Sequence, residues 1–376
     1  MTKINIIEKA LKSLYFAGKT NNAKLIFLAS LTRFSEKPVS ILIKGASGSG
    51  KSELLNTILK FIPEKDKEVF TGISEKSIAY MERNFLKHKI LGIQEFSGLN
   101  NPTGNTLLRS LLSEGKIRRM VAKNDPNDND FVNQESKVEG PVCLFMTTTE
   151  ESIHPEDENR MLSIKVDQSA EQKRLVLLAK ADAFNGVKNT KEIIQEMQLI
   201  SIEYQKNFKK VEIPYVKKIA MSMDTSFDQV LRHFDKILSL IEAHALLNQE
   251  SREIIDDKVV ANDEDYSVVC SLLEPILFEQ SKREIDFDII RIMELIKKSE
   301  IKGSFLDLSP DDIDTSNGLL AKKLQMSESA VSLKCKKARK LGLIAKDSPE
   351  GKPAIYRVLR DPSTLDKVLP SWAEIS

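Results

Sequence analysis

The sequence predicts an α/β fold: a parallel sheet covered by helices, followed by a helical segment and a small C-terminal domain. Three observations support this. A glycine-rich loop at 45–52 joins an apolar strand to a helix, apolar strands alternate with helices over 39–166, and helical periodicity dominates from about 168 to 280. Strands that alternate with helices are typical of a parallel, helix-covered sheet.

The glycine-rich loop fits the complete spacing G-x-x-x-x-G-K-S of a phosphate-binding loop. Glycine allows backbone angles that a Cβ would block, so successive N–H groups can point at phosphate oxygens, and the following helix adds its N-terminal dipole. A chance glycine-rich loop is the alternative. We expect ATP and Mg²⁺ as cofactors, with Lys51 reaching the β- and γ-phosphates and the Ser52 hydroxyl on Mg²⁺. The expected nucleotide-binding residues of this loop are Gly45, Ala46, Ser47, Gly48, Ser49, Gly50, Lys51 and Ser52.

Composition sets broad limits on the function. A chain of 376 residues has room for two or three domains, and its net charge of +1 neither favours nor excludes nucleic acid. The three cysteines lie far apart and form no C-x-x-C pair, which favours buried thiols in a reducing cytosol over metal ligands. Neither a signal peptide nor an apolar run of membrane-spanning length is present, so we expect a soluble, cytoplasmic protein that uses no membrane.

The remaining elements follow from periodicity and from Pro and Gly positions. Two helices are expected over 4–36, and an amphipathic helix over 74–85. A β-hairpin is expected from strands 116–122 and 134–138 around a polar, acidic tip. The other strands expected in the sheet are 39–43, 90–93, 141–146 and 161–166.

Hydrolysis of a nucleotide needs a carboxylate, a polar sensor of the γ-phosphate and a positive charge for the transition state. Glu95 ends a buried strand and is expected to be the carboxylate, with a solvated strand-end residue as the alternative. Gln94 stands where an Asp is usual, and a neutral amide is a weaker ligand for Mg²⁺. The sensor is expected in the run 147–149 at the end of the next strand; Thr148 is our choice, although the pattern leaves the three threonines equivalent.

Arg160 lies between two strands at the expected edge of the subunit, where it would reach a phosphate bound by a neighbouring subunit. The alternative is a local salt bridge with Asp157 or Glu158.

The final segment has the element order of a winged helix: helices at 287–298, 318–324 and 327–341, then strands at 343–346 and 354–359. Its basic residues suit contact with DNA phosphates, although winged helices also dock proteins and a basic helix face is often only solvated. The candidate DNA-binding residues here are Lys334, Lys336, Lys337, Arg339, Lys340 and Lys352.

Residues 8–170 resemble AAA+ ATPases of the helicase type, in particular the helicase domains of phages and integrative elements that are related to minichromosome-maintenance (MCM) helicases. The resemblance rests on the phrases Thr71-Gly72-Ile73-Ser74-Glu75-Lys76-Ser77, Leu108-Arg109-Ser110-Leu111-Leu112-Ser113-Glu114-Gly115-Lys116 and Thr147-Thr148-Thr149. It continues into the helical segment, where Arg232 with Leu240–Ala245, and then Asn262–Tyr266, match the MCM lid.

The resemblance implies further roles. Arg232 matches the lid arginine that meets a neighbour's γ-phosphate, and Lys123 matches a hairpin lysine that contacts DNA in the central channel of the ring. The acidic tip beside Lys123 would repel phosphate, and a solvated loop is the alternative; the basic residues on the first strand that could compensate are Lys116, Arg118 and Arg119. With no zinc motif and no N-terminal oligonucleotide-binding domain in the sequence, we expect any primase, initiator or single-strand-binding partner to be a separate chain or absent.

The predicted domains are an N-terminal helical segment (1–37), the AAA+ core (38–167), a helical lid (168–282), a winged-helix domain (283–362) and a tail (363–376). The leading hypothesis is a hexameric, ATP-driven DNA helicase or translocase that replicates a mobile element or phage. One alternative is an initiator or helicase loader that binds DNA without unwinding it, which Gln94 and the acidic tip favour. Another is a non-replicative ATPase, in an anti-phage system or a transcription regulator; the G-A-F-T-G-A loop of sigma-54-type activators is missing.

Overall fold

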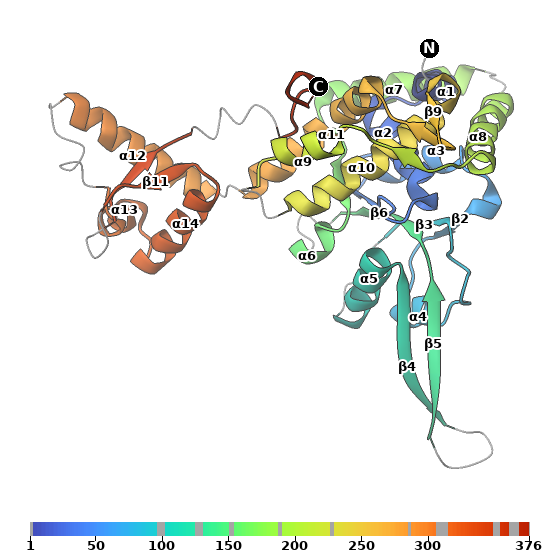
Figure 1. The fold of residues 1–376 in the computed structure, drawn as a ribbon, viewed down its shortest axis with the longest axis horizontal. Helices are drawn as coiled ribbons and strands as arrows, with labels where there is room; N and C mark the ends of the chain where they lie inside the picture. The colour runs from blue at the N-terminus through green and yellow to red at the C-terminus, as the bar shows by residue number, and fades with distance from the viewer. Residues whose placement is uncertain are drawn as a thin grey trace. The chain divides into compact units, whose positions relative to one another are not determined.

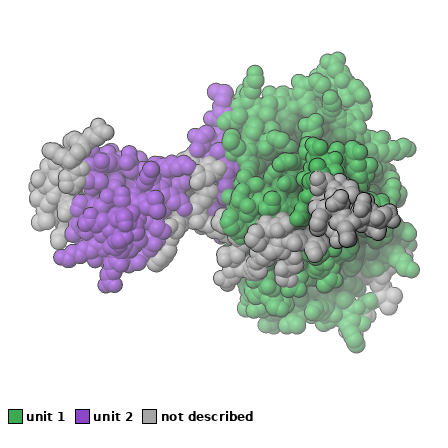
Figure 2. All heavy atoms as spheres, turned by 90° about the horizontal axis from the view of Figure 1, so that it is seen from below, with its two compact units in different colours: residues 1–220, 231–276, 376 green, residues 221–230, 277–375 purple. Residues whose placement is uncertain are grey.

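The computed structural model describes residues 3–95, 102–124, 131–149, 154–186, 190–225, 229–284, 287–305, 315–348, 354–360 and 368–375. The chain forms two compact units, shown in Figure 2. The first contains residues 1–220, 231–276 and 376, and the second contains residues 221–230 and 277–375. The domain boundaries given above remain a prediction.

A five-stranded parallel sheet forms the centre of the first unit, in the spatial order β2-β3-β6-β1-β7. Its strands are β1 (Ile41–Lys44), β2 (Lys67–Phe70), β3 (Lys89–Ile93), β6 (Val142–Thr148) and β7 (Leu162–Lys165). Every residue of β1 and β6 is buried, as expected for inner strands covered on both faces. The predicted α/β fold with a parallel sheet is confirmed.

Helices flank this sheet (Figure 1). They are α1 (Lys3–Ser13), α2 (Thr20–Leu31), α3 (Lys51–Leu59), α4 (Glu75–Ala79), α5 (Pro102–Glu114) and α6 (Pro155–Glu158). The expectation of one helix over 74–85 was wrong, because α4 ends at Ala79. The chain turns before it enters β3. Leu86 is fully buried, and His88 adopts φ +59° while its backbone N–H donates to the Pro141 carbonyl at 2.7 Å.

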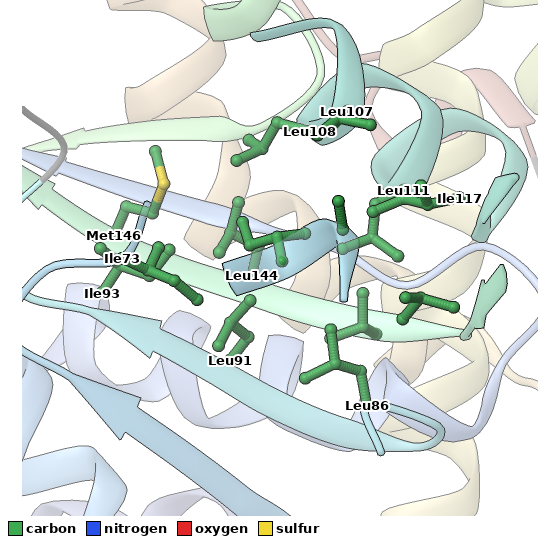
Figure 3. Close-up of a cluster of buried hydrophobic side chains, with 14 of the residues drawn as sticks. Ile73, Leu86, Leu91, Ile93, Leu107, Leu108, Leu111, Ile117, Leu144 and Met146 are labelled. Carbon is green, nitrogen blue, oxygen red and sulfur yellow. The ribbon is translucent and has the colours of Figure 1, made fainter. Parts of the chain in front are cut away.

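A long antiparallel hairpin of β4 (Lys116–Asn124) and β5 (Phe131–Glu139) projects away from the main sheet (Figure 1). Its strands extend beyond the predicted 116–122 and 134–138, since backbone pairing continues through Asn124 and Phe131 without apolar alternation. Figure 3 shows how its base is anchored. Side chains of α5 and the start of β4 pack against β3 and β6 in one buried cluster, which includes Leu107, Leu108, Leu111, Ile117, Leu91, Ile93, Leu144 and Met146.

The segment after β7 contains α7 (Ala170–Asn185), α8 (Thr190–Lys206), α9 (Val216–Ser222), α10 (Val230–Leu247) and α11 (Asp263–Glu284). The prediction that 168–280 is almost wholly helical missed a small sheet. Its strands, in spatial order, are β8 (Val211–Glu212), β10 (Lys258–Val260) and β9 (Ile254–Ile255). Strands of two or three residues are too short to show alternation, so periodicity could not reveal them.

The second unit has its own apolar core. Three helices, α12 (Phe287–Phe305), α13 (Asn317–Leu324) and α14 (Glu328–Lys340), pack with a hairpin of β11 (Ile344–Lys346) and β12 (Tyr356–Val358). Side-chain caps fix the helix starts, because Ser316 accepts from the Leu319 N–H and Ser327 from the Ala330 N–H. A final short helix, α15 (Trp372–Ile375), lies in the predicted tail.

Candidate functional site

The glycine-rich loop occupies the turn between β1 and α3, at the carboxyl edge of the parallel sheet. Gly48 and Gly50 adopt φ values of +73° and +90°, which L side chains rarely adopt, and Gly50 precedes the first residue of α3. A Cβ on Gly45 would lie 2.6 Å from the Ser49 hydroxyl oxygen. The sequence needs glycine at these positions because the loop folds tightly over the start of α3.

Lys51 is buried under this loop, and its Nζ donates to the Ala46 carbonyl at 2.8 Å. Burial lowers the pKa of Lys51. The Ser49 hydroxyl oxygen is also buried and makes no hydrogen bond within the described part of the chain. Ser52, by contrast, is exposed at the start of α3. The loop therefore presents a cationic side chain, hydroxyl groups and backbone amides at one helix N-terminus, an arrangement that suits phosphate.

A cavity of about 750 Å³ opens beside this loop. Its walls come from the connection between α1 and α2, including Tyr15 and Phe16, and from α7, including Val176 and Ala183. Gln172 ties the two walls together, because its side-chain amide donates to the Ala17 carbonyl at 2.6 Å. Apolar walls next to an anion site suit the base and sugar of a nucleotide. These residues could not be predicted from the sequence, since only the fold brings 14–22 beside 166–183.

Gln94 follows β3 and is held from three sides. Its backbone N–H donates to the Phe70 carbonyl at 3.0 Å, and its side chain donates to Asn56 Oδ1 on α3 at 3.2 Å. Thr147 donates its hydroxyl to the Gln94 carbonyl. Glu95, the next residue, is exposed. The structure thus brings Gln94 against the helix that follows the phosphate loop, with Glu95 solvent-exposed at the same strand end.

The predicted sensor threonines end β6 beside the phosphate loop. In the strand register Thr148 lies opposite Lys44, the residue before Gly45, and Thr147 lies opposite Ile43. Thr148 is 4% exposed, and the Thr147 hydroxyl is engaged with Gln94.

The carboxylates expected beside Arg160 are held by other residues. Asp157 accepts from the guanidinium of Arg109 on α5, through Nε and, at 3.1 Å, through Nη2. Glu158 pairs with Lys44 at 2.6 Å and accepts from the Ser163 hydroxyl. The alternative of a salt bridge from Arg160 to Asp157 or Glu158 is therefore not what the structure shows.

Arg160 instead contacts Glu156 at 3.5 Å, a carboxylate that Arg109 binds more closely, at 2.7 Å. Its Nε is buried and makes no hydrogen bond among the described residues. Burial lowers the pKa of Arg160, and repulsion by Arg232 lowers it further. The structure thus brings Arg160 and Arg232 into one electrostatic neighbourhood, with Arg232 exposed on α10.

The two lid phrases of the sequence meet in a buried network. His244 on α10 lies 2.6 Å from Asp265 on α11, Nδ1 to Oδ1, and both side chains are fully buried. Arg252 donates to both oxygens of Asp265, at 2.8 and 2.9 Å. Burial alone would raise the pKa of Asp265, but hydrogen bonds from His244 and Arg252 lower it. This network joins α10, the helix that carries Arg232, to α11.

On the hairpin, the candidates Lys116, Arg118 and Arg119 are exposed. Arg118 is ion-paired with Glu135 across the strands. Lys123 pairs with Val132 in the backbone register, but its side chain lies outside the described residues, as does the acidic tip.

On α14, Lys336, Arg339 and Lys340 are exposed, whereas Lys337 is half-buried. Lys334 is paired with Asp288 of α12 at 3.3 Å, so it also holds two helices together. Lys352 lies outside the described residues. In the described ranges no group of three or more His, Cys, Asp or Glu side chains could hold a metal ion, and no helix is long and apolar enough to cross a membrane.

The parallel sheet, the phosphate loop between β1 and α3 and the adjoining cavity define a P-loop NTPase, a class of nucleotide-binding proteins. A family model described as the MTBMA_p00010 P-loop domain matches residues 21–211, about half of the chain, and the chain belongs to this family. A comparison with curated proteins finds no match.

Proposed function

We propose that the protein is an MCM-like AAA+ ATPase that assembles as a hexameric ring or open spiral and moves along DNA, in the replication of a mobile element or phage. The observation that carries this proposal is the pair Arg160 and Arg232. The charges that act on Arg160 come from Arg232, Glu156, Arg109 and Asp157, and none of these belongs to the phosphate loop. Arg109 binds Glu156 and Asp157 more closely than Arg160 does. Two neighbouring guanidinium groups are suited to a phosphate supplied by another copy of the chain.

The phosphate loop then forms half of each active site. Mg²⁺, held by Ser52 and the nucleotide, would neutralise charge on the β- and γ-phosphates. The chemistry of the donors fits this ion, since the Ser52 hydroxyl is an exposed hard ligand at the start of α3. Lys51 would leave the Ala46 carbonyl to bind phosphate, Glu95 would orient the attacking water, and Thr148 would sense the γ-phosphate. Arg160 and Arg232 of the neighbouring copy would stabilise the transition state.

Coupling to DNA would run through the apolar cluster at the base of the hairpin. Ile117 of β4 packs in the same core as Ile93 of β3 and Met146 of β6 (Figure 3). β3 ends at Ile93, just before Gln94, and β6 ends at Thr148, which lies opposite the residue before the phosphate loop. A close-packed interior transmits small displacements, so a shift at the strand ends would move the hairpin. Lys116, Arg118, Arg119 and Lys123 on the hairpin, and a winged-helix domain in the second unit, are the proposed DNA contacts.

An assay of DNA-stimulated ATPase activity and of strand displacement on a forked duplex tests this function. The wild-type protein should hydrolyse ATP faster with DNA and separate the strands, and Lys51→Ala and Glu95→Gln should abolish both activities. Unwinding by these variants at the wild-type rate would refute the motor. Intact ATPase activity without unwinding, under every loading condition, would instead support the initiator or loader, which the amide of Gln94 in place of a carboxylate favours. ATPase activity that is indifferent to DNA would favour a non-replicative ATPase, such as one of an anti-phage system.

A further inference from the structure

Lys236 on α10 reaches the segment that carries Arg160. Its Nζ donates to the Asn159 carbonyl at 3.1 Å and to the Met161 carbonyl at 2.8 Å. These two carbonyls flank Arg160 in sequence. The contact is buried, with Lys236 only 8% exposed. The Lys236 side chain therefore hydrogen-bonds the backbone on both sides of Arg160.

The same helix presents Arg232 one turn earlier. Residues four apart lie on the same face of a helix, so Arg232 and Lys236 point to the same side of α10. The residues just before Arg160 are held by other elements, since Arg109 of α5 binds Asp157 and Lys44 of β1 binds Glu158. Among the described residues, the hydrogen bonds of Lys236 thus connect the backbone around Arg160 directly to α10, the helix that bears Arg232.

Electrostatics explains why a tie is needed. Arg160 and Arg232 repel each other, and this repulsion is one cause of the lowered pKa of Arg160. Lys236 is buried beside them, and burial, followed by the charge of Arg232, lowers its pKa to about 7. This repulsion favours movement of the backbone around Arg160 away from α10. Buried hydrogen bonds to backbone carbonyls oppose that movement, because carbonyls left without donors are costly.

We propose that Lys236 is a positioning residue, which holds Arg160 at a fixed place relative to Arg232 so that both guanidinium groups meet one phosphate of the neighbouring copy. This inference rests on the proposed function. It assigns Lys236 no contact with nucleotide. A displacement of about 1 Å at a reacting group can cost about 100-fold in rate, so the tie is expected to matter for turnover.

The test is a double-mutant cycle on ATPase turnover. Lys236→Met keeps the apolar stem and removes the donors, and Lys236→Arg keeps the charge and N–H donors. Lys37→Met is the matched control, because Lys37 also contacts α10, through an exposed ion pair with Asp235 at 2.9 Å. Each variant is measured for kcat, for the KM of ATP, for ATP binding by calorimetry and for helical content by circular dichroism.

Lys236→Met is expected to lower kcat at least tenfold at unchanged ATP affinity, with Lys236→Arg recovering most of the loss and Lys37→Met matching the wild type. The double variant that combines Lys236→Met with Arg160→Ala should have the same kcat as Arg160→Ala alone, because Lys236 acts through Arg160. The positioning role would be overturned if the two substitutions multiplied their effects on kcat in the double variant. It would also be overturned if Lys236→Met left kcat unchanged, or if Lys236→Met lost both ATP binding and helical content. A wild-type kcat in Arg160→Ala itself would contradict the proposed function instead, so the two failures are distinguishable.

Discussion

The substitution Asp265→Ala should destabilise the packing of α10 against α11 by about 3–5 kcal/mol, the usual cost of removing one partner from a buried ion pair. In the structure the Asp265 carboxylate is fully buried and accepts from His244, from Arg252 and, at 2.9 Å, from the Asn262 N–H. The Arg252 side chain is only 3% exposed, so after the substitution its charge would keep a single described carboxylate partner, Glu264 at 2.9 Å. The penalty is therefore that of a buried cation left poorly paired.

Hydrogen exchange with mass spectrometry is the appropriate assay, because a chain of two compact units need not unfold in one step. Peptides from α10 and α11 should lose protection in Asp265→Ala, whereas those of α14 in the second unit should not change. Glu264→Gln is the control, since that carboxylate is 42% exposed and its pairing should be worth less than about 1 kcal/mol. Wild-type protection of α10 in Asp265→Ala would refute the reasoning.

The pH dependence has a definite sign. The pKa of Asp265 in the folded protein lies below its ordinary value of 3.8, so its ionised form is favoured by folding. This contribution is complete above about pH 4 and is lost as the pH falls through the lowered pKa. Acid should therefore reduce the protection of α10 and α11 in the wild type, and Asp265→Ala should show a weaker acid dependence. Equal acid dependence in the two proteins would contradict this account.

Three further outcomes are expected. Ser52→Ala should raise the Mg²⁺ concentration needed for half-maximal ATPase activity by about tenfold or more, and an unchanged requirement would remove Ser52 as a ligand. Ser327→Ala should destabilise the second unit by about 1 kcal/mol, because the Ala330 N–H loses its capping acceptor. A thermal melt followed by the fluorescence of Trp372 measures this change, and an unchanged midpoint would refute the capping role. Thiol labelling at pH 8 should be about 100-fold or more slower in the native than in the denatured protein, since burial raises the thiol pKa to about 11 or 12; equal rates would show exposed thiols. The cysteines concerned are Cys143, Cys270 and Cys335.

The phosphate loop could be predicted from sequence because its chemistry is local. The positive φ values of Gly48 and Gly50 follow from a spacing of a few residues, and the strand before it and the helix after it are visible as apolar runs. The parallel sheet was predictable for the same reason, since strands buried on both faces are continuously apolar. Elements without such a pattern, such as the strands β8, β9 and β10, could not be found.

The environment of the site was not predictable, because it depends on contacts between distant segments. The alternative role of Arg160, a salt bridge with its sequence neighbour Asp157 or Glu158, does not form, because Arg109 and Lys44 occupy those carboxylates in the fold. Lys236 gave no signal, since a lysine in a helix is usually solvated. Only its position under the backbone of 159–161 shows that it is buried.

We propose that Arg160 of one copy completes the active site at the phosphate loop of another copy, and a mixing experiment tests this arrangement most directly. Lys51→Ala has a defective phosphate loop with intact arginines, and Arg160→Ala has the reverse. Each variant alone should have little ATPase activity. If the site is shared, an equal mixture should regain about one quarter of the wild-type activity, because random assembly places an intact loop beside an intact arginine in that share of the interfaces. Activity of the mixture that equals the mean of the two separate variants, at concentrations where the wild type is fully active, would contradict the account.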